Sequence, residues 1–537
     1  MALIFSLFVC VGVAVVTASD GLLSSSDLAG SRPNFLILFA DDFGYGDVGH
    51  NNPSVGTDTK YIDALAASGI TFKDMHTFPL CTPSRAQLLT GRLGVRTGVV
   101  KNFVTESTAG LPRTEHTIAE LLKTVGYDTA QAGKWHLGTH AGFHPTFRGF
   151  DQSLTVPYSV DMGCLGPAGG PYWNLPQPPP CPTGPNTDPT STDDPALPLY
   201  NATLNCGGGS CNAQIVQQPL LENQLDSHYV DYLTSFFQQH SAPGSNPFFA
   251  YMAFSHTHVP LFHSPKFTNS SSRKTIFADT TMEFDDSVNR IIEALHLYGL
   301  ANNTLVFATA DNGPWKVKCD LAGSPGPYIG AYQKKLGGGS SLKDTTWEGG
   351  QRVFGLASWP GKILPGVISN ATVSSLDYLP TILALAGVPL PNDRSYDGVD
   401  LSPLLFDGQE SVRDFLFMGD TTGGGGPRGG NVTSVRYKNW KLYTKTYSQP
   451  GCNEDAAPSV EHPDYLVFDL DNDPGESTPI TLPKEIMDIV WQAHHDKLVD
   501  INSTFQSKVD YSTGTDMISS APCCNPQNAY CRCDPNM

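Results

Sequence analysis

The segment Cys81-Thr82-Pro83-Ser84-Arg85 combines residue types that could bind and attack an anionic group. Pro83 suits the first turn of a helix, because its missing N–H would have had no partner there. Cys81 then lies at the helix entrance, where free N–H groups and the helix dipole favour an anion. Arg85 shares a face with that end, and Gly91 stands where a left-handed residue commonly ends a helix. For a cysteine taken alone, a buried structural thiol is the plainer interpretation.

Four apolar segments of strand character end in polar residues that could meet at one site. Residues 34–39 lead to Asp41-Asp42, residues 305–310 to Asp311-Asn312, residues 128–132 to Lys134 and His136, and residues 248–254 to His256 and His258. Ligands of open α/β sheets bind at the carboxyl ends of strands, so these segments can converge on one crevice. A lone Asp-Asp or Asp-Asn pair is usually a turn former. The joint occurrence of the four points to a site.

The acidic members of this set predict a metal site. Three carboxylates and an amide oxygen, from Asp41, Asp42, Asp311 and Asn312, form an all-oxygen donor set. Such a set suits Ca²⁺ or Mg²⁺ and not zinc, which prefers His and Cys. The flexible geometry of carboxylate ligands favours Ca²⁺, with Mg²⁺ as the alternative.

The formal net charge of −19 argues against a nucleic-acid-binding protein. An acidic protein repels an anionic substrate at long range, so the site must gather positive charge locally. Lys134, Lys343 and Arg85 could supply it, although a solvated surface role is the usual one for a single lysine. In extended backbone, Lys134 and His136 would point into the same space because they are two residues apart.

The elements that must position these side chains alternate along the chain. Helical spacing over residues 59–67, 117–124 and 279–297 separates the strand-like segments. This alternation predicts an α/β sandwich with a mainly parallel sheet. We expect this α/β domain to span residues 33–410. It should contain a Pro- and Gly-rich insertion over residues 163–215 that disulfides cross-link.

Near residue 410 the pattern changes. Short strand-like runs and a final amphipathic segment predict a smaller α+β domain with an antiparallel sheet over residues 411–537. The runs are 415–418, 433–437, 440–443 and 465–470, and the helical segment is 483–499. We interpret the Gly-rich residues 423–430 as a loop.

Residues 1–18 have the uncharged apolar core and small-residue end of a secretory signal peptide. The run is too short to span a bilayer, and no later segment is long and apolar enough, so we expect no transmembrane anchor. Of the 12 cysteines, Cys10 lies in this leader and Cys81 in the motif, which leaves ten for disulfides of unassigned pairing. Sequons suggest a glycoprotein, at Asn201, Asn269, Asn302, Asn370, Asn431 and Asn502.

The motif from Cys81 to Arg85, continued by Thr90-Gly91-Arg92, resembles the signature of the type I sulfatases. In that family it marks the cysteine for oxidation to Cα-formylglycine. From about residue 33 onwards the chain resembles the arylsulfatase A and N-acetylgalactosamine-6-sulfatase branch. The resemblance implies an alkaline-phosphatase-like α/β sandwich and hydrolysis of aryl, sugar or galactolipid sulfate esters. It also implies a formylglycine-hydrate nucleophile, a covalent sulfo-enzyme intermediate and bound calcium.

The resemblance further implies a role for each residue of the site. Its metal ligands are Asp41, Asp42, Asp311, Asn312 and the oxidised Cys81. Its catalytic and substrate-binding residues are Arg85, which orients the nucleophile, the sulfate-binding Lys134 and Lys343, the base His136, the leaving-group donor His258 and the substrate contact Ser159. His256 is expected to be a spectator. The implied partners are a sulfated small molecule, glycan or glycolipid and, during biosynthesis, the formylglycine-generating enzyme. The implied location is lysosomal or extracellular, and a homo-oligomer is left open.

Two other functions remain open on the sequence. A phosphoesterase of the same superfamily would ordinarily offer Ser or Thr as the nucleophile, and Cys81 in its motif speaks against it. An inactive secreted glycan-binding or matrix protein on a sulfatase scaffold would be expected to lose catalytic positions, and none is lost here.

Overall fold

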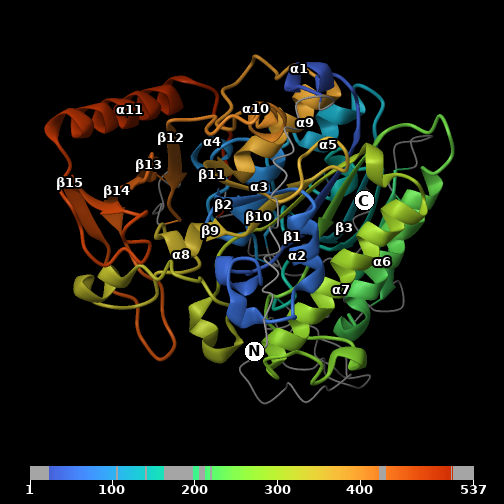
Figure 1. Cartoon of the computed structure of the whole chain (residues 1–537), viewed down its shortest axis with the longest axis horizontal. Helices are drawn as coiled ribbons and strands as arrows, with labels where there is room; N and C mark the ends of the chain where they lie inside the picture. Colours follow the sequence, from blue (N-terminus) through green and yellow to red (C-terminus); the bar gives the residue numbers. More distant parts are fainter. Residues whose placement is uncertain are drawn as a thin grey trace, which may run out of the picture.

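The computed structural model of the chain describes residues 23–104, 107–138, 142–162, 197–204, 212–217, 220–421, 431–509 and 511. Within these residues the strands form two separate sheets, one of 11 strands and one of 4 (Figure 1). The predicted α/β architecture with a smaller antiparallel sheet is confirmed. The predicted signal peptide, most of the predicted insertion and the Gly-rich residues 423–430 lie outside the described residues.

The centre of the large sheet is built from parallel strands. β1 (Asn34–Ala40) pairs in parallel with β7 (Phe248–Ala253) and with β8 (Thr304–Ala310). β3 (Asp128–Lys134) lies parallel to β7 on its other side. All residues of β1 are buried, as expected for a parallel strand that is covered on both faces.

Further strands, some of them antiparallel to their neighbours, complete the large sheet. On the β8 side they are β10 (Gly355–Ser358), β2 (Ile70–His76) and β11 (Val367–Ser374), with β9 (Arg352–Val353) paired to β2. On the β3 side they are β4 (Gln152–Val156), β5 (Leu199–Thr203) and β6 (Asn212–Gln217). The end of the predicted insertion therefore contributes two antiparallel strands, β5 and β6, of which β6 forms the edge of the sheet.

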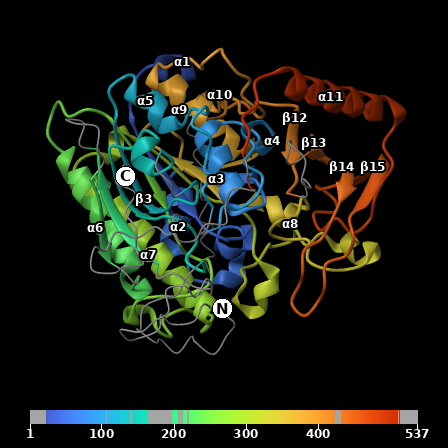
Figure 2. The same cartoon turned by 180° about the vertical axis from the view of Figure 1, so that it is seen from behind.

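Two groups of helices pack around the large sheet (Figures 1 and 2). One group is α2 (Lys60–Ala67), α6 (Glu222–Gln239) and α7 (Ile276–Leu297); the other is α3 (Cys81–Thr90), α5 (Ile118–Lys123) and α9 (Tyr378–Ala386). Shorter helices are α1 (Ser25–Leu28), α4 (Gly94–Thr97), α8 (Glu348–Gln351) and α10 (Ser402–Phe406). Among the described residues, no helix combines the length and the apolarity that crossing a membrane requires.

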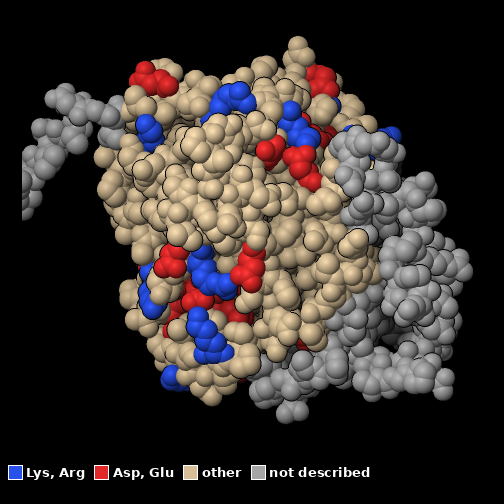
Figure 3. Space-filling model, turned by 90° about the vertical axis from the view of Figure 1, so that its right-hand side faces the viewer, with Lys and Arg blue, Asp and Glu red and all other residues tan. Residues whose placement is uncertain are grey.

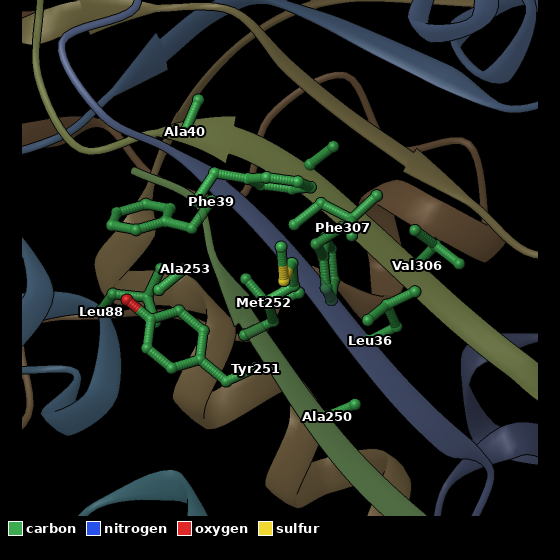
Figure 4. Packing of buried hydrophobic residues seen from close by; sticks show 14 of the residues in the cluster. Leu36, Phe39, Ala40, Leu88, Ala250, Tyr251, Met252, Ala253, Val306 and Phe307 are labelled. Atoms are coloured by element: carbon green, nitrogen blue, oxygen red, sulfur yellow. The ribbon is translucent and has the colours of Figure 1, made fainter. Parts of the chain in front are cut away.

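Apolar packing fixes α3 to the central strands. Figure 4 shows Phe39 of β1, Tyr251 of β7 and Phe307 of β8 in one cluster, with Leu88 of α3 beside them. All residues of α3 are buried. Each large apolar side chain that is buried contributes about 1.5–3 kcal/mol. The helix that carries Cys81 is therefore held rigidly against the sheet.

The second sheet lies beside the first one, toward the end of the chain (Figure 1). Its strands, in spatial order, are β12 (Phe415–Gly419), β13 (Val432–Tyr437), β14 (Trp440–Thr446) and β15 (Val460–Asp469). Helix α11 (Lys484–Ser503) covers it through a small core that includes Val435, Leu442 and Val490. The domain boundary at residue 410 stays a prediction.

A buried network of ion pairs joins the two sheets. Glu348 of α8 accepts from Lys441 of β14 at 2.6 Å and from Arg352 at 2.6 Å. Asp74 of β2 pairs with Arg352 and, at 3.3 Å, with Arg436 of β13. Burial alone would raise the pKa of Glu348, but Lys441 and Arg352 outweigh it and hold that pKa well below its usual range. The network keeps both carboxylates charged where no solvent reaches them.

We predict that Lys441→Met lowers the free energy of unfolding by about 3 kcal/mol, because it leaves part of the charge on the buried Glu348 uncompensated. Urea denaturation followed by fluorescence measures the change. Lys438→Met at the exposed β13–β14 turn is the matched control and should stay within about 0.5 kcal/mol of the unmodified protein. An equal, small effect of both substitutions would contradict a stabilising role for the network.

Candidate active site

The carboxyl ends of β1 and β8 bring the acidic residues together. Asp41 and Asp42 follow β1, and Asp311 and Asn312 follow the neighbouring β8. The backbone N–H of Asp42 donates to Asp311 Oδ1 at 3.1 Å, and Asn312 Nδ2 donates to Asp42 Oδ1 at 2.7 Å. All four residues are buried. The structure thus assembles the oxygen donors that the sequence predicts.

Helix α3 presents Cys81 to this acidic group. Cys81 is the first residue of the helix, and its Sγ lies 3.6 Å from Asp41 Oδ1. The Thr82 N–H of the first turn donates to Asn102 Oδ1 at 3.0 Å. Gly91 ends the helix with φ 65°, in the left-handed conformation that the sequence predicts. Burial raises the pKa of the Cys81 thiol well above its usual range, although Lys134 and Lys343 oppose the shift.

Three cations face the same carboxylates. Lys134 Nζ lies 2.6 Å from Asp41 Oδ2, Arg85 Nη2 lies 2.8 Å from Asp311 Oδ2, and Lys343 Nζ lies 2.6 Å from Asp42 Oδ1. Burial alone would lower the pKa of Lys134 and Lys343, but the neighbouring carboxylates raise it in both. The lysines therefore remain charged and supply the local positive charge that the acidic composition demands.

Two histidines line the crevice and a third does not. His258 Nε2 lies 3.4 Å from Asp42 Oδ2 and 3.3 Å from Lys343 Nζ. His136 Nε2 lies 3.0 Å from the Phe103 carbonyl oxygen. His256 is instead enclosed between Asp226 and Glu283, each 3.1 Å away. Burial would lower the pKa of His256, but these two carboxylates raise it to about 10.

The structure brings Lys134 and His136 together by a different route from the predicted one. β3 ends at Lys134, and His136 has φ 56°, so the extended alternation assumed from the sequence stops before it. Ser159 lies 3.3 Å from Lys134 Nζ and 3.5 Å from His258 Nδ1 through its Oγ. The Ser159 hydroxyl therefore links Lys134, at the end of β3, with His258, which follows β7.

A cavity of about 450 Å³ opens from Cys81 toward the second sheet. Its lining includes residues that the sequence reasoning did not assign: Lys101, Asn102, Asp161, Trp315, Asp344, Thr421 and Gln449. The Trp315 ring lies 4.5 Å from Lys343 Nζ and 5.5 Å from the His258 ring. These residues come from segments far apart in the sequence.

The acidic residues fit a hard cation. Side-chain ligand atoms of Asp41, Asp42, Cys81 and His258 lie within 4.8 Å of one another. Asn312 Oδ1 is buried and accepts no hydrogen bond from the described residues. An orphaned amide oxygen beside buried carboxylates is a donor set that Ca²⁺ and Mg²⁺ prefer. The residues present could therefore hold such an ion.

Comparison with known proteins gives consistent matches along the chain. Residues 33–388 match the family Sulfatase, and residues 415–533 match the C-terminal region of aryl-sulfatase. The chain is 40% identical over 520 residues to arylsulfatase G of Rattus norvegicus, which covers 95% of this chain and 94% of that protein. It is 36% identical over 547 residues to arylsulfatase A of Homo sapiens, with coverages of 96% and 98%. Among solved structures, the PsFucS1 sulfatase from Pseudoalteromonas sp. has a TM-score of 0.76 at 28% identity, covering 89% of this chain and 92% of that one.

The chain therefore belongs to the sulfatase family, and the resemblance to the type I sulfatases is confirmed. It is a sulfuric ester hydrolase that acts on sulfate esters. Membership implies a formylglycine and a bound metal ion, and the buried acidic cluster beside Cys81 could hold the ion.

We predict that Asn102→Ala destabilises the protein by about 1 kcal/mol, because it removes the acceptor that caps the first turn of α3. Thermal unfolding, read by circular dichroism, measures the loss. Asn102→Asp keeps a capping oxygen and should unfold close to the unmodified protein. Equal losses in the two variants would show that the cap contributes nothing.

Proposed function

We propose that this sulfatase uses a formylglycine made from Cys81, beside a calcium ion, to cleave the sulfate ester. The observation that carries the proposal is the position of Cys81 at the entrance of α3, against Asp41 and near the buried cations Lys134, Lys343 and Arg85. When present, the hydrated formylglycine would supply a nucleophilic oxygen, and calcium held by Asp41, Asp42, Asp311, Asn312 and the modified residue would neutralise charge on the sulfate. Arg85, bonded to the Lys134 carbonyl and to Asp311, keeps the start of α3 against the acidic residues.

The chain's own cations bind and polarise the sulfate. Lys134 and Lys343 approach Cys81 from β3 and from the segment before α8, and Ser159 lies between Lys134 and His258. Charge that develops on sulfate oxygens is stabilised most by cations that are already fixed in a dry site. We propose that Lys134, Lys343 and Ser159 hold the sulfate group.

Two histidines are suited to move protons. His136 donates from Nε2 to the Phe103 carbonyl, which leaves Nδ1 without a hydrogen-bond partner among the described residues. Burial, with Lys134 and Arg85, holds the pKa of His136 well below its usual range, so the ring is neutral and its Nδ1 can accept a proton. His258 holds Nε2 toward Asp42, and we propose that it donates a proton to the leaving oxygen.

The proposed substrate class is an aryl, sugar or galactolipid sulfate. Relatives are named as arylsulfatases and as an N-acetylgalactosamine-6-sulfatase, which supports sulfated rings as substrates. On the face that Figure 3 shows, charged side chains of the described residues stand in small groups of mixed sign and form no broad basic tract.

We further propose a glycosylated protein of the secretory pathway, lysosomal or extracellular, that a formylglycine-generating enzyme modifies.

A mass spectrum of the tryptic peptide 74–85, from protein made in a secretory host, tests the modification. We expect a peptide about 18 Da lighter than the unmodified cysteine form, since oxidation replaces the thiol by an aldehyde. Cys81→Ala should lose all measurable hydrolysis of 4-nitrophenyl sulfate while its circular dichroism spectrum stays that of the folded parent protein. A fully alkylated Cys81 in a host that modifies a control sulfatase would refute the proposal.

Removal of divalent cations tests the metal. EGTA should lower the melting temperature, and Ca²⁺ should restore it, because an ion at 100 times its dissociation constant stabilises the folded state by about 2.7 kcal/mol. Asp42→Asn should abolish the Ca²⁺-dependent shift, whereas the control Asp471→Asn, at an exposed turn, should retain it. Restoration by Mg²⁺ alone would identify a different ion, and no shift with either ion would exclude the site.

A further inference from the structure

The cavity beside Cys81 is lined by two chemically different groups of residues. His136, His258 and Lys343 suit an anion. Asp344 lines the same cavity, with Thr421 and Gln449 from the last part of the chain. A carboxylate there opposes the binding of a sulfate ester unless it makes a favourable contact with the rest of the substrate.

Asp344 is held in an unusual backbone conformation. Its φ is 66°, in the left-handed region that non-glycine residues adopt uncommonly and aspartate more often than most. The Asp344 N–H donates to the carbonyl oxygen of Pro79, two residues before Cys81, at 2.6 Å. This bond ties the turn that carries Lys343 and Asp344 to the start of α3.

Gln449 fixes the direction of the Asp344 side chain. Gln449 Nε2 donates to Asp344 Oδ2 at 2.7 Å. Gln449 is itself fixed, because its backbone forms an antiparallel bridge with Ser340 and the disulfide Cys319–Cys452 closes the same region. The carboxylate is therefore a preorganised acceptor in the wall of the cavity.

Burial and neighbouring groups shift the pKa of the Asp344 carboxyl. Burial raises the pKa of Asp344 to about 6, although Thr421, Lys343 and Lys101 oppose the shift, while Asp420 adds to it. Asp344 Oδ1 is buried and accepts no hydrogen bond from the described residues, whereas Oδ2 accepts from Gln449. The carboxylate therefore keeps the capacity to accept a hydrogen bond from a ligand.

We propose that Asp344, directed by Gln449, is a specificity-determining residue that accepts a hydrogen bond from a hydroxyl group of the leaving group. The inference rests on the proposed function and deepens it. A sulfated sugar ring carries hydroxyls next to the ester, whereas a simple aryl sulfate carries none. Asp344 therefore favours sulfated sugars over aryl sulfates of similar size, and the last part of the chain takes part in substrate selection through Gln449.

The test compares two kinds of substrate on the same formylglycine-containing protein. The probes are 4-nitrophenyl sulfate and a panel of galactose and glucosamine monosulfates, from which the best substrate is chosen. Asp344→Gly removes the carboxylate and suits the positive φ. It should lower kcat/KM for the sugar sulfate about tenfold to a hundredfold, mainly through KM, as expected for the loss of a hydrogen bond to a charged group. Hydrolysis of 4-nitrophenyl sulfate should change less than about twofold, since the aryl ester makes no such bond.

Asp344→Asn and Gln449→Ala provide second variants that keep the backbone intact, and both should shift the substrate ratio in the same direction. Lys438→Gly is the matched control, because it replaces another residue of positive φ at an exposed turn. Equal losses on both substrates in all Asp344 variants would overturn the inference and leave the proposed function standing. If the formylglycine-containing protein without substitutions cleaves the aryl ester but no sugar sulfate, the inference alone is overturned. Failure to cleave either substrate, with formylglycine verified, would overturn both.

Discussion

The compensation of buried charge at the carboxyl ends of β1, β3 and β8 is the constraint on which the rest of the structure depends. Asp41 is fully buried and lies 2.6 Å from Lys134 Nζ and 3.5 Å from Arg85 Nη2. Burial would raise the pKa of Asp41, but these cations and His258 lower it. Buried charges of this kind are tolerated only when their partners are held in place. The apolar central strands and the fully buried α3 provide that rigidity, and this explains why the polar site sits on the most apolar part of the chain.

Part of this arrangement could be predicted from the sequence. The buried central strands are continuous apolar runs, and parallel strands place their carboxyl ends at one edge, so the meeting of Asp41, Asp42, Asp311 and Asn312 follows from a general rule. The helix at Cys81 follows from local signals at Pro83 and Gly91. His136 shows the limit of such reasoning. His136 reaches the crevice because its own backbone is left-handed, and not because side chains alternate along a strand. The extended backbone expected over these residues does not contain this turn.

Other parts depend on contacts between distant segments. β2 carries Lys73 and Asp74 inside a buried strand, and Asp74 is tolerated there because Arg352 and Arg436 neutralise it. Polar residues within a buried strand break the apolar run by which such a strand is recognised in the sequence. The wall residues Asp344 and Gln449 are 105 positions apart and become neighbours only when the second sheet docks. Spacing cannot reveal such a pair, whereas the motif residues are recognisable because their spacing is itself the signal.

The surroundings of Cys81 support the proposed modification on grounds other than family resemblance. Sites that use cysteine as a nucleophile lower the pKa of the thiol with nearby positive charge, because the thiolate is the reactive form. Around Cys81 the cations Lys134 and Lys343 act in that direction, yet burial together with Asp311 and Asp41 raises the pKa well above its usual range. The unmodified thiol is therefore protonated and a poor nucleophile, although Lys134, Lys343 and Arg85 supply positive charge around it. A site that gathers cations around an unreactive thiol is consistent with the proposed modification, in which the side chain at position 81 reacts through oxygen. The same carboxylates that disfavour a thiolate suit a neutral diol beside a cation.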